Sequence, residues 1–127
     1  MLYNPDWKPK TEPIVDAVGM VMLKAADYLE TNKWGQGDFL LSDGAVCLMG
    51  ALQKIETGTV VSYLDDELFC PIADKALDRI EKYLNKHLPP NIHKFSDEYV
   101  LPYDFNDEED RTKEEVIDVL RKASTFI

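Results

Sequence analysis

A block of 19 residues, which spans positions 34–52, places the tightest constraint on what this chain can fold into. It combines a tryptophan, four glycines, an Asp-Gly dipeptide and a cysteine between two helical patterns. A simple helix bundle has no need of such a block, because glycine serves where a chain turns sharply or is closely approached. Within the block, residues 39–46 predict a short β-hairpin that turns at Asp43-Gly44, a dipeptide that tolerates positive φ angles. The block therefore predicts a closely specified insertion in a helical protein.

Two helices are predicted in the first half of the chain from apolar residues at helical spacing. The first begins near Thr11, a candidate N-cap that is followed by Pro13 in the first turn, and it ends near Asn32. The second runs from about residue 46 to residue 56, and Gly58 follows it as a typical C-terminal residue.

Two more helices are predicted in the second half. The third opens at Pro71 and stops before Pro89-Pro90. The fourth begins at Thr112, which forms the expected capping box with Glu115 three residues later.

These elements predict a mainly α protein: a single small domain of about four helices with a short β-hairpin insertion. Residues 1–11 are predicted to form an extended N-terminal arm, and residues 12–127 the helical domain. Residues 59–64 are ambiguous between strand and helix, and residues 89–111 are predicted to be irregular.

The charge balance limits the classes of partner. The chain has 24 acidic and 14 basic residues, which gives a net charge of −10. Such a surface disfavours direct binding to nucleic acid, whose phosphates require clusters of lysine and arginine. Basic protein surfaces, cations and neutral small molecules are the partners that this charge favours.

The cellular compartment is predicted from what the chain lacks. Cys47 and Cys70 are too few for a disulfide framework, and the first residues do not follow the pattern of an export signal. No apolar run reaches the roughly 20 residues that a membrane-spanning helix needs. We therefore expect a cytoplasmic protein with reduced thiols and no membrane association.

Three short elements stand out by their order and spacing. They are Trp-x-Gln-Gly at 34–37, Cys-x-x-Gly-Ala-Leu at 47–52, and Asn106-Asp107 with Thr-x-x-Glu-Val at 112–116. In this order they resemble a family of small bacterial and phage proteins that is classed as a domain of unknown function. The resemblance spans about residues 20–124. It implies a shared fold and a phage or mobile-element context, and it implies no activity.

Cys47 is the first candidate for chemistry, since a helix N-terminus lowers the pKa of a thiol. Gln36 precedes it, and His93 and Asn106 follow it, in the chain order of papain-like hydrolases. The hypothesis makes Cys47 the nucleophile, His93 the base, Asn106 the residue that orients the base, and Gln36 the oxyanion donor. The apolar residues after Cys47 favour a buried and inert thiol instead, so a cysteine-dependent hydrolase or transferase is the alternative function.

Asn106 and Asp107 also have a structural interpretation, which we favour over a catalytic one. Their side chains bond nearby backbone groups readily and form turns. One of them is also suited to satisfying the polar groups of the glycine-rich block from across the domain.

A calcium site is the weaker interpretation of the acidic segment that follows. Oxygen-bearing side chains between Asp104 and Glu115 match the ligand positions of an EF-hand loop, but Glu109 stands where that loop needs glycine. Pro102 also interrupts the incoming helix. We therefore predict no metal site and no cofactor.

The preferred function rests on ten acidic and only two basic residues between Asp97 and Asp118. It is a non-enzymatic accessory protein of phage or mobile-element type that binds a basic surface of a host protein, as a nucleic-acid mimic or an anti-defence inhibitor. The predicted binding residues are Asp97, Glu98, Asp104, Asp107, Glu108, Glu109 and Asp110, with Asp65, Asp66 and Glu67 as a second patch.

A third hypothesis is a small-ligand-binding domain with a pocket beside Trp34 and Gln36, where the glycines permit a close approach of the backbone. The composition leaves the oligomeric state open.

Overall fold

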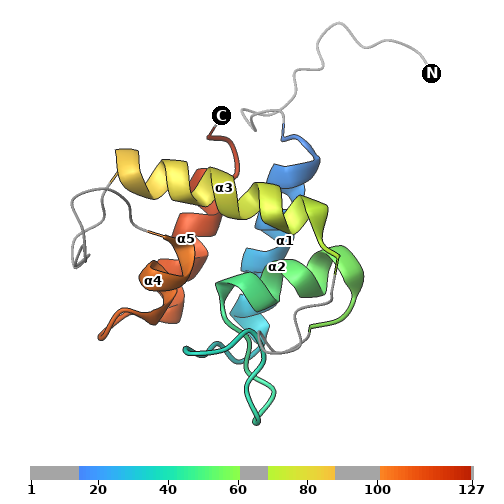
Figure 1. The fold of residues 1–127 in the computed structure, drawn as a ribbon, viewed down its shortest axis with the longest axis vertical. Coiled ribbons are helices and arrows are strands. Elements are labelled where there is room, and N and C mark those ends of the chain that lie inside the picture. The colour runs from blue at the N-terminus through green and yellow to red at the C-terminus, as the bar shows by residue number, and fades with distance from the viewer. Residues whose placement is uncertain (1–14, 61–68, 88–100, 127) are drawn as a thin grey trace, which may run out of the picture.

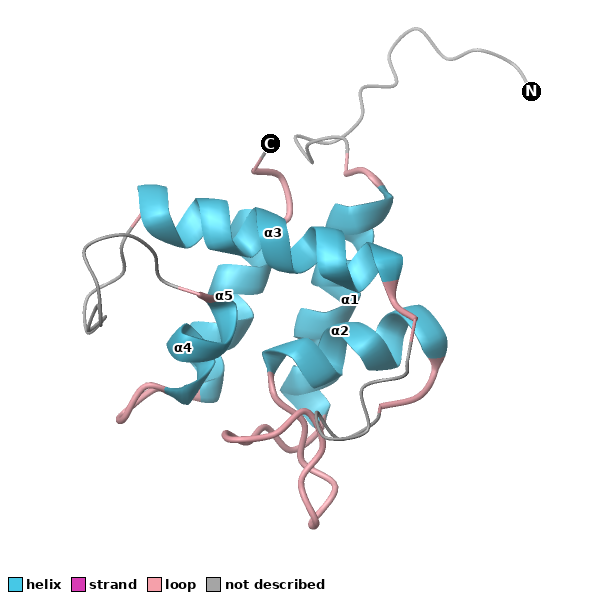
Figure 2. Cartoon of the chain, viewed as in Figure 1, coloured by secondary structure: helices cyan, strands magenta, loops and turns pink. Residues whose placement is uncertain are grey.

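A computed structural model describes residues 15–60, 69–87 and 101–126. Five helices lie in these ranges, in the order α1 (Ala17–Thr31), α2 (Leu48–Thr57), α3 (Pro71–Lys86), α4 (Pro102–Asp107) and α5 (Lys113–Ala123) (Figure 1). Within the same ranges the connections are turns and loops, and no strand is formed (Figure 2). The predicted mainly α class is confirmed.

Helix α1 lies at the centre of the domain and packs against α2, α3 and α5. Figure 1 shows α3 running across α1 and α5, with α4 beside α5. The core between them consists of fully buried apolar side chains at helical spacing, and its largest members include Met22, Leu29, Leu52, Ile80, Leu84, Phe105 and Leu120.

The first helix begins later than predicted. Asp16 is its N-cap, and the Asp16 carboxylate accepts a hydrogen bond from the N–H of Gly19 at 2.8 Å. A capping carboxylate satisfies one of the unpaired N–H groups of the first turn, so the sequence from Asp16 onward supplies a complete start signal. Thr11 and the proposed arm at residues 1–11 lie outside the described residues.

The predicted β-hairpin is wrong, although its turn is present. Gly44 has φ of 87°, and the N–H of Leu41 bonds the carbonyl of Ala45 at 2.9 Å. A second bond, from the N–H of Cys47 to the carbonyl of Phe39 at 3.3 Å, completes an isolated antiparallel bridge between Leu40 and Val46, and the pairing extends no further. The backbone of Val46 also bonds a second segment. Its N–H donates to the carbonyl of Lys33 at 3.1 Å, and its carbonyl accepts from the N–H of Gly35 at 3.0 Å. Val46 is thus bridged to Leu40 on one side and to Trp34 on the other, but these bridges stay isolated and form no strand.

Glycine at position 50 is explained by the same loop. A β-carbon at Gly50 would lie 2.1 Å from the carbonyl oxygen of Phe39, so loop and α2 are in direct backbone contact. The loop is therefore packed against the N-terminal turn of α2 at Phe39.

The interval 89–111, predicted to be irregular, contains α4 in its described part. Pro102 stands in the first turn of this helix, where a missing N–H has no cost. Six residues make a helix too short to be stable by propensity, so its tertiary contacts must hold it.

Helix ends elsewhere follow the prediction closely. Gly58 ends α2 in the left-handed conformation, and Pro71 opens α3. Thr112 and Glu115 form the expected capping box of α5. A further cap, which the sequence pattern does not reveal, comes from Glu56 of α2, whose carboxylate accepts from the first N–H groups of α3 at 2.7 and 3.1 Å.

Candidate functional site

A buried asparagine on α4 is the point where distant segments of the chain meet. Asn106 is fully buried, and its Oδ1 accepts from the indole N–H of Trp34 at 2.8 Å and from the N–H of Leu48 at 3.0 Å. Its Nδ2 donates to the carbonyl of Gly35 at 3.3 Å and to the Asp107 carboxylate at 2.9 Å. The side-chain amide of Asn106 thus provides hydrogen-bond partners for polar groups of both the loop and the N-terminus of α2.

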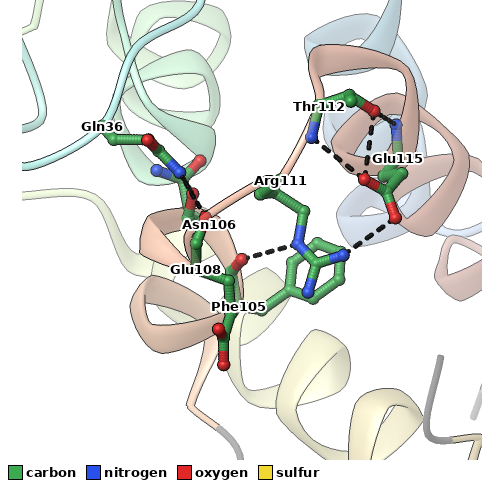
Figure 3. A network of polar contacts seen from close by, with 7 residues as sticks. All are labelled: Gln36, Phe105, Asn106, Glu108, Arg111, Thr112 and Glu115. Carbon is green, nitrogen blue, oxygen red and sulfur yellow. Dashed lines mark hydrogen bonds and ion pairs between the residues drawn. The ribbon is translucent and has the colours of Figure 1, made fainter. Parts of the chain in front are cut away.

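Gln36 and Asp107 complete this contact from either side. Gln36 Nε2 donates to the carbonyls of Asn106 and Glu108, each at 2.8 Å (Figure 3). Asp107 Oδ1 accepts from the N–H of Gly37 at 3.0 Å. The predicted structural role of Asn106 and Asp107, which is to satisfy the glycine-rich block from across the domain, is confirmed by these bonds. We call this set of contacts the Asn106 hub.

Arg111 fixes the turn that follows α4. Its side chain is only 1% exposed, and it donates to the carbonyl of Phe105 and to the Glu115 carboxylate, both at 2.9 Å. Figure 3 shows the guanidinium against the Phe105 ring, 4.0 Å from the ring centre. A buried cation is tolerated only when it is paired and hydrogen-bonded, and Arg111 meets both conditions. Its charge is consequently directed into the domain.

The acidic residues around this turn form the surface that we call the acidic face: Asp104, Asp107, Glu108, Glu109 and Asp110. Asp107, Glu109 and Asp110 are exposed, and Asp104 and Glu108 are half-buried. Asp110 adopts a positive φ of 69°, a conformation that aspartate tolerates better than most residues. The other predicted binding residues, Asp97 and Glu98, lie outside the described residues, as does the second patch at 65–67.

The structure overturns the expected effect of the helix terminus on Cys47. Cys47 is the N-cap of α2, where its Sγ accepts from the N–H of Gly50 at 3.4 Å, but the side chain is only 1% exposed. Burial outweighs the nearby backbone N–H groups and raises the pKa of the thiol to about 12. A thiol in this state stays protonated near neutral pH.

The other members of the proposed catalytic set do not complete it. Gln36 and Asn106 lie close to Cys47 in the fold, but both are committed to the Asn106 hub. His93 lies outside the described residues. The hydrolase alternative stays a prediction, and the described geometry gives it no activated nucleophile.

The described structure places a hollow near the glycine-rich block, although not where the third hypothesis expects it. It has a volume of about 540 Å³ and is lined by Gly37, Asp38, Phe39, Cys47, Met49, Tyr103 and Asp107. Trp34 and Gln36 are not among its lining residues, and their polar groups are bonded within the Asn106 hub. The aromatic Tyr103 was missed, since its pairing with Phe39 and Met49 arises only when α4 docks on α2.

The residues from Asp104 to Glu115 do not form an EF-hand loop. Positions 104–107 are helical, and Glu115 is bonded to Thr112 and Arg111. Across the described ranges, no group of three or more His, Cys, Asp or Glu side chains is arranged to hold a metal ion. Nor does any helix there have the length and apolar character to cross a bilayer. The two cysteines, both buried, form no disulfide.

The fold and the hub define a small, mainly helical domain whose non-helical loop is clamped by a buried asparagine. Comparison with family models identifies the family of the chain. It belongs to a family of unknown function, DUF6197, whose model matches residues 14–126. The resemblance drawn from the three short elements is thereby confirmed. No curated protein and no solved structure matches the chain.

Proposed function

We propose that this protein is a non-enzymatic accessory protein that binds a basic surface of a host protein through the acidic face. The observation that carries the proposal is the inward position of Arg111. It is the only basic residue between Asp104 and Thr112, and its side chain is buried against Phe105. The carboxylates of the acidic face are therefore presented to a partner without a neighbouring exposed cation on the same segment.

The acidic face is also built on a well-supported backbone. The Asn106 hub holds α4 from one side, and the capping box of Thr112 and Glu115 holds the start of α5 on the other. A surface that is already ordered loses little conformational entropy on binding, and a concentrated negative field accelerates encounter with a basic partner. Both properties suit a binding protein.

The phage or mobile-element setting is part of this proposal and derives from the sequence resemblance. Mimicry of nucleic-acid phosphates and inhibition of a defence protein are two forms that it would take. In each, the partner contributes a groove or patch rich in lysine and arginine.

The test compares two variants of equal net charge. The first neutralises four residues of the acidic face through Asp104→Asn, Glu108→Gln, Glu109→Gln and Asp110→Asn. Asp107 is left intact because it accepts the bond from Gly37. The control neutralises four exposed carboxylates elsewhere, through Asp27→Asn, Glu30→Gln, Asp74→Asn and Asp118→Asn. Thermal unfolding is measured to check that both variants fold.

Tagged wild type and both variants are used to capture proteins from a lysate of the natural host, and the captured partner is then purified for affinity measurement. We expect wild type and control to bind the same partner, more weakly at high salt, and the first variant to bind at least tenfold more weakly. The proposal fails if the first variant binds with wild-type affinity, or if no stoichiometric partner is captured at low salt.

A further inference from the structure

An apolar groove adjoins the acidic face and shares Asp107 with it. The hollow at Gly37 and Cys47 continues across Met49 and Tyr103 into a second hollow of about 310 Å³. The second is lined by Met49, Leu77, Asp78, Glu81, Leu101, Pro102 and Tyr103. Together they form what we call the Tyr103 groove, between α4, the start of α2 and the middle of α3.

The lining of the groove combines an apolar floor with acidic edges. Phe39, Met49 and Tyr103 supply the floor, and Tyr103 keeps 49% of its surface exposed. The acidic edges are Asp38 and Asp107 at one end and Asp78 and Glu81 at the other.

The described residues that line the two hollows of the groove include no lysine or arginine. Two other hollows in the described part of the chain differ, because Lys122 lines one and Lys113 and Arg121 line the other. Asp78, at the edge of the second hollow, pairs with Lys82 at 3.0 Å, and both side chains are exposed. The described lining therefore combines carboxylates with an apolar floor, which complements a basic ligand that carries apolar side chains.

Asp107 is oriented to take part in binding. Its Oδ1 accepts both of the hydrogen bonds that hold it, from Gly37 and from Asn106. These bonds fix the carboxylate while its second oxygen remains available at an exposed position. A fixed carboxylate beside an aromatic floor is suited to a lysine or arginine, whose aliphatic stem packs on apolar surface.

We propose that the Tyr103 groove binds a basic amphipathic peptide segment of the partner protein. Apolar side chains of the segment occupy the two hollows on either side of Met49 and Tyr103, and its lysines or arginines face Asp107 and Glu81. This is recognition of an amphipathic segment by a hydrophobic groove, with the edge charges selecting basic sequences. The inference rests on the proposed function and names the part of the partner that is bound.

The experiment uses the full chain and two synthetic peptides of equal charge, acetyl-Lys-Leu-Lys-Lys-Leu-Lys-amide and its counterpart with serine in place of leucine. Binding is followed by the backbone amide chemical shifts of ¹⁵N-labelled protein. We expect the leucine peptide to bind at least tenfold more tightly and to shift Gly37, Phe39, Met49 and Tyr103. Tyr103→Ser should weaken it at least tenfold, whereas Phe69→Ser, at an aromatic residue that is 82% exposed outside the groove, should not.

The outcomes separate the groove from the acidic face. Equal binding of both peptides, lost in the variant with four neutralised acids, overturns the groove and leaves the proposed function standing. Leucine-dependent binding that survives this neutralisation, with no captured host partner, supports the groove and removes the proposed function. Absence of binding by either peptide overturns the groove. Shifts at the groove that depend on protein concentration alone would assign it to a second copy of the chain and overturn the proposal.

Discussion

Asn106 uses both ends of its side-chain amide to connect parts of the domain that are far apart in sequence. Its oxygen serves two N–H groups, and its nitrogen serves a carbonyl and a carboxylate. Such a buried amide is costly to lose because each former partner is then left without a hydrogen bond.

We predict that Asn106→Ala lowers the free energy of unfolding by about 2–4 kcal/mol, since unsatisfied buried groups cost about 1–3 kcal/mol each. Urea unfolding followed by far-UV circular dichroism measures the loss. Asn32→Ala is the control, because Asn32 is exposed and its change should stay within about 0.5 kcal/mol. A loss below about 1 kcal/mol at Asn106 would show that the hub contributes little.

Cys47 gives a prediction at alkaline pH. Burial raises the pKa of its thiol from 9.0 to about 12, so the unfolded chain releases this proton first. The contribution of Cys47 to stability is therefore intact below pH 9 and is lost as pH rises toward 12, with a slope of up to about 1.4 kcal/mol per pH unit.

Denaturant unfolding of wild type and Cys47→Ala between pH 8 and 11 isolates this slope, because other alkaline groups titrate in both. The folded thiol should also react with a thiol reagent far more slowly than a cysteine introduced at the exposed position Thr125. Rapid labelling of native Cys47 would contradict the buried state and restore the hydrolase alternative.

At the scale of elements, one ion pair joins three helices. Arg79 of α3 donates to both carboxylate oxygens of Asp16, the N-cap of α1, and to the carbonyl of Ser124 at the end of α5. The hydrogen bonds from Arg79 and from the N–H of Gly19 hold the pKa of Asp16 well below its usual range. A lowered pKa means that the contribution to stability is present above pH 4 and is lost as pH falls.

We predict that Asp16→Asn flattens the acid side of the stability profile. Asparagine preserves the N-cap but cannot form the ion pair, so the melting temperature should fall less between pH 5 and pH 3 than that of wild type. Asp74→Asn, at an exposed position of α3, should keep the wild-type profile. An unchanged pH dependence in Asp16→Asn would rule out the ion pair as a source of acid sensitivity.

The elements also show where local sequence is sufficient to predict structure and where it is not. Thr112 and Glu115 lie three residues apart, so their capping box is visible in the sequence and forms as predicted. Helix α4 is held in place by the contacts of Phe105 and Asn106 with segments that are remote in sequence, so no local sequence pattern predicts this helix. The loop before α2 also depends on a contact that a hairpin pattern does not predict, since Val46 bonds Lys33 and Gly35 as well as bridging Leu40.

On the scale of the whole molecule, the charge and fold class were accessible from composition and spacing, but the site was only partly so. The acids of the acidic face are plain in the sequence, whereas the inward position of Arg111 depends on Phe105 lying beneath it. The groove is a tertiary property, since Met49 and Tyr103 lie more than 50 positions apart. The protonated state of Cys47 likewise depends on burial, which a helix-terminus argument does not include.

The long separation of the hub's partners sets an order of folding. Asn106 follows Trp34 by 72 residues and Leu48 by 58, and closing a chain over such distances costs more entropy than forming a helix turn. During synthesis the loop that precedes α2 emerges well before α4, and its hydrogen-bond partner does not yet exist. We therefore expect the loop and the acidic turn to become ordered in one late step, so that a nascent chain lacks an ordered acidic face until α4 has left the ribosome.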